Sequence, residues 1–171
     1  MKKILVFVST LDGKITQWGR SPVKDWTSKE DQEYFHKTWN DSTLIVMGSS
    51  TYNVAPMKPS PENHLVIMTS ETEKYKDKVV EGQIEFSNQS PAELVDHFEK
   101  LGVKQMTVVG GSQIATSFFK SECIDEVWLT IEPKIFGTGG SFVSEEKLNV
   151  NLELIEMEKV NDRGTLLTKY A

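Results

Sequence analysis

Apolar residues rich in Val, Ile and Leu gather into five short runs along the chain, each bounded by turn residues. The runs cover residues 3–8, 43–47, 64–69, 105–109 and 127–131. Runs of this length and composition predict β-strands. Several of them are continuous rather than alternating, which is typical of strands that are covered on both faces. Because helical segments fall between them, the pattern favours an α/β fold with a central, mixed and mostly parallel sheet flanked by helices.

Capping residues mark the expected helices. Residues 90–93, Ser-Pro-Ala-Glu, form a capping box with proline at the first helical position, and an apolar face follows it. A second box at residues 27–30 precedes a helix expected to end near residues 40–41. Two shorter helices are expected to follow Gly48 and Gly111.

The last part of the chain predicts an antiparallel hairpin that closes the sheet. Residues 152–160 and 165–170 have strand character and flank the turn Asn-Asp-Arg-Gly at 161–164. No internal repeat or low-complexity linker divides the chain. We therefore expect residues 1–171 to form a single domain.

Composition and charge narrow the function classes. The formal net charge of -6 and the presence of only two arginines argue against a nucleic-acid partner. No segment approaches the roughly 20 apolar residues of a membrane span, and the apolar run at residues 4–8 is too short for a signal peptide. Since Cys123 stands alone, no internal disulfide is expected, and a cytoplasmic location fits best.

Several common chemistries lack their sequence motifs. His36, His64, His97 and Cys123 lie too far apart to match a zinc site, and no metal is expected. A P-loop, a Gly-x-Ser-x-Gly elbow and a Gly-x-Gly-x-x-Gly fingerprint are all missing. Any phosphate site must therefore use backbone amides, hydroxyls and isolated lysines.

Two junctions share a design suited to such a site. Residues 44–51, Leu-Ile-Val-Met-Gly-Ser-Ser-Thr, and residues 107–114, Thr-Val-Val-Gly-Gly-Ser-Gln-Ile, each run from a strand through glycine into a helix. Free amides at a helix start attract phosphate oxygens, and glycine lets the backbone approach closely. Two neighbouring junctions of this kind could bind a diphosphate between them. The alternative is that these glycines only make tight turns.

Two further segments follow strands. Asp12 lies in Thr-Leu-Asp-Gly-Lys at residues 10–14, directly after the first strand, where ligands of open sheets collect. The Asp-Gly pair is also an ordinary turn signal. A glycine-rich loop leaves another strand at residues 131–140.

In this order, the features resemble the reductase domain that forms the C-terminal half of bifunctional riboflavin-biosynthesis deaminase-reductases, a relative of dihydrofolate reductase. The family's Ser-Leu-Asp-Gly-Lys is echoed at residues 10–14, its Trp-Ile-Ser at 26–28 and its Gly-x-x-Thr at 48–51. Its Gly-Gly helix start falls at residues 110–111, and its Asp-Glu motif with later Pro and Gly falls at 125–137. The resemblance covers nearly the whole chain.

The resemblance implies an NADPH-dependent enzyme with a sheet of about eight strands, often homodimeric, that acts on a small molecule. It places the diphosphate between two strand ends and the adenosine 2′-phosphate at a third. The implied cofactor residues are, on the three ends, Gly48, Ser49 and Thr51; Gly110, Gly111, Ser112, Gln113 and Ile114; and Thr69 and Ser70.

The implied reaction is hydride transfer from the nicotinamide C4 to a C=N or C=O, as in 5-amino-6-(5-phosphoribosylamino)uracil reductase. Asp12 is the leading candidate to orient the substrate or relay the proton. Asp31 is the alternative, because Asp31 and Phe35 resemble the acidic position of dihydrofolate reductases; the acid could equally complement the helix dipole. The substrate pocket is expected to include Thr10, Trp26 and Thr27.

Two departures from the family keep other functions open. Val6 stands where the family often has lysine, and Ser49 stands where dihydrofolate reductases have arginine. The alternatives are a dihydrofolate-reductase-type enzyme, which antifolate binding would reveal, and a non-catalytic NADP(H)-binding module, which would bind the cofactor without turnover.

Overall fold

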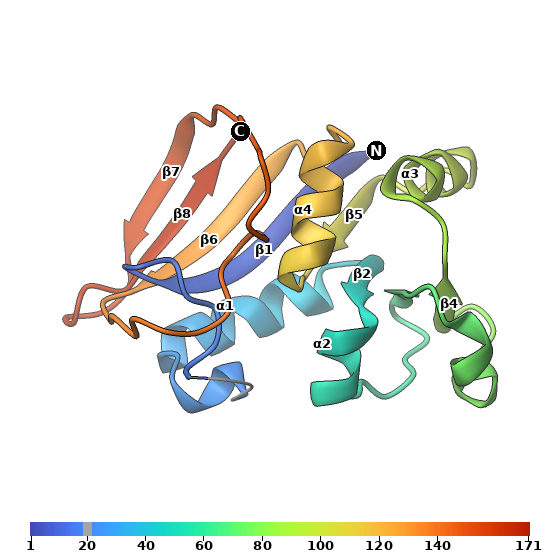
Figure 1. Ribbon diagram of the computed structural model, residues 1–171, viewed down its shortest axis with the longest axis horizontal. Helices are drawn as coiled ribbons and strands as arrows, with labels where there is room; N and C mark the ends of the chain where they lie inside the picture. The colour runs from blue at the N-terminus through green and yellow to red at the C-terminus, as the bar shows by residue number, and fades with distance from the viewer. Residues whose placement is uncertain (19–21) are drawn as a thin grey trace.

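A sheet of eight strands forms the centre of the computed structural model, which describes residues 1–18 and 22–171 (Figure 1). The strand order is β4-β3-β2-β5-β1-β6-β8-β7. The strands from β4 to β6 run parallel, whereas β8 is antiparallel to β6 and β7 is antiparallel to β8. This arrangement confirms the expected α/β class, the mixed sheet and the C-terminal hairpin. The bounds are β1 Lys2–Thr10, β2 Leu44–Gly48, β3 His64–Met68, β4 Ile84–Ser87, β5 Gln105–Val108, β6 Glu126–Glu132, β7 Leu154–Lys159 and β8 Leu166–Tyr170.

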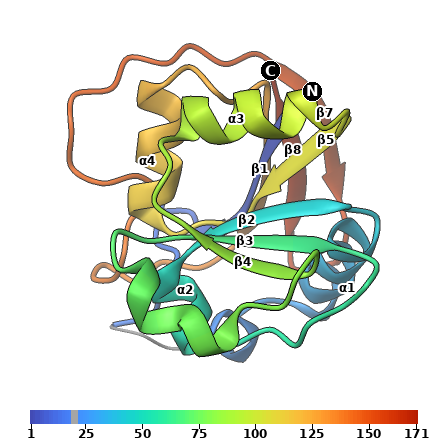
Figure 2. The same ribbon diagram turned by 90° about the vertical axis from the view of Figure 1, so that its right-hand side faces the viewer.

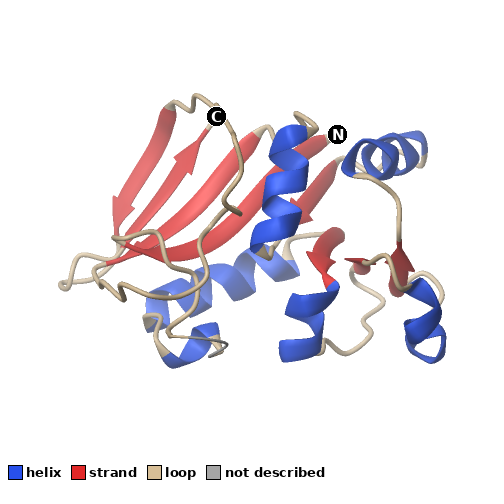
Figure 3. Cartoon of the chain, in the orientation of Figure 1, coloured by secondary structure: helices blue, strands red, loops and turns tan. Residues whose placement is uncertain are grey.

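Helices cover both faces of the sheet (Figures 1 and 2). On one face lie α3, Pro91–Lys100, and α4, Ser112–Lys120; on the other lie α1, Lys29–Asn40, and α2, Ser49–Val54. Figure 3 shows that the long loops after β1 and β6 gather where these parallel strands end. The described residues also form the short 3₁₀ helices η1, Val23–Asp25, and η2, Thr72–Lys78.

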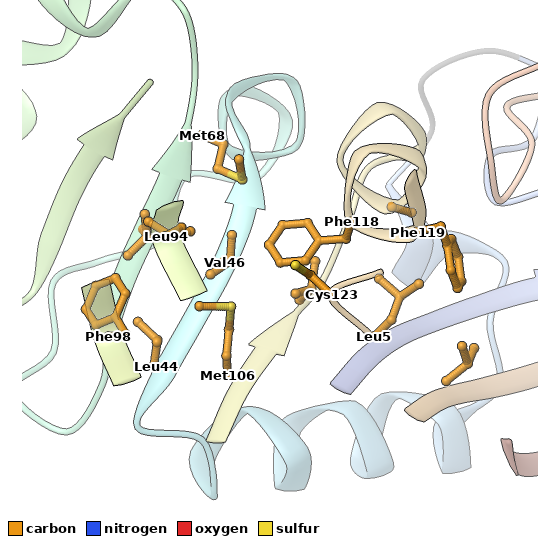
Figure 4. Packing of buried hydrophobic residues seen from close by; sticks show 14 residues of the cluster. Leu5, Leu44, Val46, Met68, Leu94, Phe98, Met106, Phe118, Phe119 and Cys123 are labelled. Atoms are coloured by element: carbon orange, nitrogen blue, oxygen red, sulfur yellow. The ribbon is translucent and has the colours of Figure 1, made fainter. Parts of the chain in front are cut away.

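The continuous apolar sequence of β2 reflects burial on both faces, as its pattern predicted. Leu44 and Val46 pack into the cluster beneath α3 and α4, while Ile45 and Met47 pack on the opposite face with Tyr52 of α2. Burying one such side chain stabilises the fold by roughly 1.5–3 kcal/mol. Figure 4 shows the first cluster, in which β2 meets Leu94 and Phe98 of α3 and Phe118 of α4.

The two expected capping boxes have different outcomes. At α3 the box is present, because Glu93 N–H donates to Ser90 Oγ at 3.4 Å and Ser90 N–H donates to Glu93 Oε2 at 2.8 Å. At α1 the prediction is wrong by one residue. The cap is Ser28, whose Oγ accepts the N–H of Asp31 at 3.2 Å.

The two edge strands of the sheet are β4 and β7. The sequence patterns did not single out β4, because it is short and only Ile84 is fully buried. β7 forms the other edge, and all of its residues are exposed. No helix in the described ranges is long and apolar enough to cross a membrane.

Candidate active site

The two glycine junctions lie side by side at the carboxyl ends of β2 and β5. These strands pair in parallel, with Val46 opposite Val108. The backbone N–H of Gly48 donates to the carbonyl oxygen of Gly110 at 2.8 Å. Because α2 begins directly after Gly48 and α4 directly after Gly111, both helices start at the same edge of the sheet.

Close packing between the two junctions explains two of the glycines. A Cβ on Gly48 would lie 2.8 Å from Cγ1 of Ile114 in α4. A Cβ on Gly111 would lie 3.3 Å from Oγ1 of Thr51 in α2. The starts of the two helices thus approach each other as closely as backbone without side chains allows.

Gly110 is needed for its backbone conformation as well as for space. Its φ is +100°, a value that residues with a side chain rarely adopt, and its Cβ would lie 2.7 Å from Cζ of Phe7. The peptide bond between Gly110 and Gly111 is cis. Phe7 therefore packs directly beneath the second junction and links it to β1.

The helix starts at these junctions also differ from the others in their caps. Serine side chains cap α1 and α3, but no side chain of residues 1–18 or 22–171 caps α2 or α4. The first amides of a helix have no partner within the helix, so an uncapped start offers donors to an anion. The hydroxyl of Ser112 is already committed, because it donates to the carbonyl oxygen of Ser141. Ser49 is half-buried and Gln113 is exposed.

Thr69 and Ser70 follow β3, the neighbour of β2, at the same edge of the sheet. The N–H of Thr69 donates to the carbonyl oxygen of Ser87 at 2.8 Å, and its Oγ1 accepts the N–H of Glu71 at 3.1 Å. Thr69 is half-buried and Ser70 is exposed. Both residues therefore follow the strand next to that of the first junction, and both are accessible to a ligand.

Asp12 is bound by groups from two loops. Its carboxylate accepts the hydroxyl of Thr10 at 2.5 Å, the N–H of Gly137 at 2.7 Å and the N–H of Phe136 at 3.2 Å. These bonds, led by that of Thr10, lower the pKa of Asp12 because they stabilise the ionised form. The geometry suits a carboxylate that joins the loops after β1 and β6 better than one that releases a proton.

Asp31 has the opposite environment. Its side chain is buried in the first turn of α1, and burial raises its pKa to about 6. The hydroxyls of Thr130 in β6 and Thr27 bond the carboxylate and oppose that rise, while the charge of Glu132 adds to it. An acid with a pKa near 6 is partly protonated close to neutral pH, as proton transfer requires.

Trp26 lies between these two acids in the chain and is also buried. Its ring meets that of Phe136 edge to face, with centroids 5.1 Å apart, and its carbonyl oxygen accepts the Nζ–H of Lys134. Among the described residues its Nε1–H is buried without a hydrogen-bond partner. Since Phe136 also donates its N–H to Asp12, one residue connects Asp12 with Trp26.

Sequence patterns did not single out Thr130 or Glu132, although both lie at the site. Their signal is a polar pair at alternate positions near the end of the apolar strand β6, which places both side chains on one face. A cavity of about 360 Å³ opens beside Glu132 and is lined by Thr27, Ser28, Glu132, Pro133, Lys134, Arg163 and Thr165. A larger cavity of about 550 Å³ lies away from the junctions, between α4 and the loop before β7.

Comparison with known proteins connects this geometry with a family. The sequence matches the family model of the RibD C-terminal domain over residues 2–166. The uncharacterized protein YyaP of Bacillus subtilis (strain 168) is 25% identical over 162 residues, which cover 89% of this chain and 85% of that protein.

Solved structures share the fold. A diaminohydroxyphosphoribosylaminopyrimidine deaminase/5-amino-6-(5-phosphoribosylamino)uracil reductase from Thermotoga maritima aligns over 99% of this chain, with a TM-score of 0.75 and 18% identity; the chain spans 56% of that protein. Dihydrofolate reductase from Enterococcus faecalis, complexed with NADP(H), aligns over 99% of this chain and 93% of its own length, with a TM-score of 0.68 and 20% identity. These findings confirm the resemblance and the fold that the motifs implied.

Proposed function

The chain belongs to the RibD C-terminal domain family, and on that premise we propose that it is an NADPH-dependent reductase of a C=N or C=O bond in a small heterocyclic or glycosylamine substrate. One observation carries the proposal. Two uncapped helix starts lie at the carboxyl ends of the parallel strands β2 and β5, and a buried acid with a pKa of about 6 bonds Thr130 near the carboxyl end of β6. The helix starts can bind a diphosphate, and the acid can supply a proton.

The junctions fit a dinucleotide in shape and in chemistry. The amides after Gly48 and Gly111 would bind the diphosphate from its two sides, and the close contact of each glycine with the other junction would keep the two helix starts at a fixed spacing. Thr69 and Ser70, one strand farther along, would donate their hydroxyls to the 2′-phosphate. From there the nicotinamide end would extend over β1 towards β6, because the strand order places β1 between β5 and β6.

Asp31 is the proton donor in this proposal. When bound, NADPH would supply a hydride from its nicotinamide C4 to the carbon of the substrate C=N or C=O, which leaves the electron pair of the π bond on the heteroatom. Asp31 gives that heteroatom a proton, directly or through one water, and regains a proton from solvent.

Asp12 has a supporting role. Its carboxylate fixes the loop at residues 136–137, and the Phe136 ring packs against Trp26. This chain of contacts holds the wall of the substrate pocket. The unpartnered Nε1–H of Trp26 would then be satisfied by a water or by an acceptor atom of the substrate, since a buried donor without a partner is unfavourable.

A panel of substrates tests the proposal. NADPH oxidation would be followed with 5-amino-6-(5-phosphoribosylamino)uracil, dihydrofolate and related pterins, and NADPH binding would be measured separately by fluorescence titration. We expect saturable binding and turnover of at least one substrate. Binding without turnover of any compound would support a non-catalytic NADP(H)-binding module instead, and absence of binding would contradict both functions.

A further inference from the structure

Glu132 is a second buried carboxylate on the face of the sheet that holds Asp31. It ends β6 with only 2% of its surface exposed, two residues after Thr130, whose hydroxyl bonds Asp31. No lysine, arginine or histidine within residues 1–18 and 22–171 forms an ion pair with it. Burial of a carboxylate without a cation is costly, so its bonds must compensate.

Neutral donors from two distant segments hold both oxygens of this carboxylate. Oε1 accepts the backbone N–H of Ser28 at 2.6 Å, and Oε2 accepts the hydroxyl of Thr165 at 2.8 Å. Ser28 is the cap of α1, and its Oγ accepts the N–H of Asp31. Glu132 therefore holds the residue that begins the helix on which Asp31 lies.

Other charged groups surround the pair but are engaged elsewhere or exposed. Lys134, after β6, donates to the carbonyl oxygen of Trp26. Arg163, in the turn between β7 and β8, lines the cavity beside Glu132 and is exposed. On α1 itself, Glu30 accepts a hydrogen bond from Asn161 at 3.0 Å. Glu132 remains as the carboxylate whose Coulombic interaction opposes ionisation of Asp31.

We propose that Glu132 is a positioning residue for Asp31: by accepting the N–H of Ser28 it fixes the start of α1 and so the place of the Asp31 carboxyl group. The charge of Glu132 is then coupled to Asp31, because two nearby carboxylates in a buried site resist ionising together. The catalytic meaning of this coupling rests on the proposed reductase function, whereas the coupling itself is a property of the chain alone.

The test is an NMR titration of the Asp31 carboxyl carbon in the full chain without cofactor. Glu132→Gln keeps the size and an acceptor but removes the charge, and we expect it to lower the pKa of Asp31 by roughly 0.5–1. Glu126→Gln is the matched control, since Glu126 lies on the same strand and face but is paired with Lys2 at 2.7 Å. An Asp31 pKa that responds equally to both changes, or to neither, overturns the proposal.

A measurement on the unchanged protein covers the case in which Glu132→Gln does not fold. The Ser28 amide should then be protected from hydrogen exchange, because a buried charged acceptor holds it; exchange as fast as that of exposed loop amides would contradict the positioning role. Once a substrate is found, Glu132→Gln should also shift the pH profile of turnover to lower pH. If Asp31 responds in the titration but no substrate turns over, the coupling stands and the reductase proposal fails.

Discussion

Thr130 in β6 bonds the carboxyl group of Asp31 in α1 through its hydroxyl and so connects the buried acid with the last parallel strand of the sheet. The contact fixes the side chain where burial raises its pKa to about 6. Asp12, by contrast, is held as a carboxylate by three donors. We therefore expect substitutions of the two acids to have different effects.

Replacing Asp31 should remove the proton source. Asp31→Asn keeps the size of the side chain but cannot release a proton, and we expect turnover to fall by roughly 10²–10⁴-fold with NADPH binding unchanged. In the unchanged protein the rate of the proposed reaction should decrease as the pH rises through about 6, because Asp31 must be protonated to donate. This decrease should be absent in Asp31→Asn, measured at saturating NADPH.

Asp12→Asn is the control for that experiment. It weakens the bonds to the loop at residues 136–137, so the rate should fall, but the dependence on pH near 6 should remain. If Asp12→Asn instead abolishes the pH dependence and Asp31→Asn keeps it, Asp12 is the proton donor.

The raised pKa of Asp31 also predicts how stability depends on pH. The folded state favours the protonated acid, whose pKa rises from 3.8 to about 6. The contribution of the protonated acid to the free energy of unfolding is complete below pH 3.8 and is lost as the pH rises through about 6. The loss amounts to about 3 kcal/mol, as an order of magnitude. The free energy of unfolding of the unchanged protein and of Asp31→Asn should be measured with denaturant at pH 4 and pH 7. We expect the unchanged protein to be more stable relative to Asp31→Asn at pH 4 than at pH 7; the same difference at both pH values would contradict the prediction.

Gly48 tests the spacing of the two junctions. In Gly48→Ala the backbone conformation is acceptable, but the new Cβ would lie 2.8 Å from Ile114 and force the start of α4 away from α2. We expect NADPH affinity to fall about tenfold or more, which corresponds to roughly 1.4 kcal/mol. Gly82→Ala serves as the control for location, because a Cβ there meets none of the described residues within 4 Å and its turn lies outside the site; its φ of +69° makes it a test of backbone strain away from the junctions. Equal NADPH affinity in both variants would argue against the site.

Thr69 and Ser70, at the carboxyl end of β3, should determine the preference for NADPH over NADH. Replacing Thr69 and Ser70 together with alanine removes the hydroxyls proposed to bind the 2′-phosphate. NADPH affinity should fall roughly ten- to a hundredfold, about 1.4–2.8 kcal/mol in total, which corresponds to the loss of about one hydrogen bond to a charged group. NADH affinity should stay the same and so serves as the internal control. A parallel loss for both cofactors would indicate damage to the turn that the Thr69 hydroxyl closes with Glu71.

Local features of the chain could be predicted because their causes are local. The capping box at Ser90 needs only residues three positions apart, and the continuous apolar run of β2 by itself indicates a strand covered on both faces. The hairpin around residues 161–164 likewise follows from its turn sequence. The glycine junctions could be recognised as candidates from the same short-range pattern.

The tertiary structure decided which of these candidates meet and what state they are in. Strand order places Gly48 against Gly110, and no local pattern specifies that order. The cap of α1 also depends on tertiary contacts. By sequence, the hydroxyl of either Thr27 or Ser28 could cap the helix. In the folded chain Thr27 bonds the Asp31 side chain, whereas Ser28 caps the helix and donates its N–H to Glu132 of β6. Burial and hydrogen bonds from distant segments set the pKa of an acid, so the proposal of Asp31 rather than Asp12 as the proton donor rests on partners that only the folded chain brings within reach.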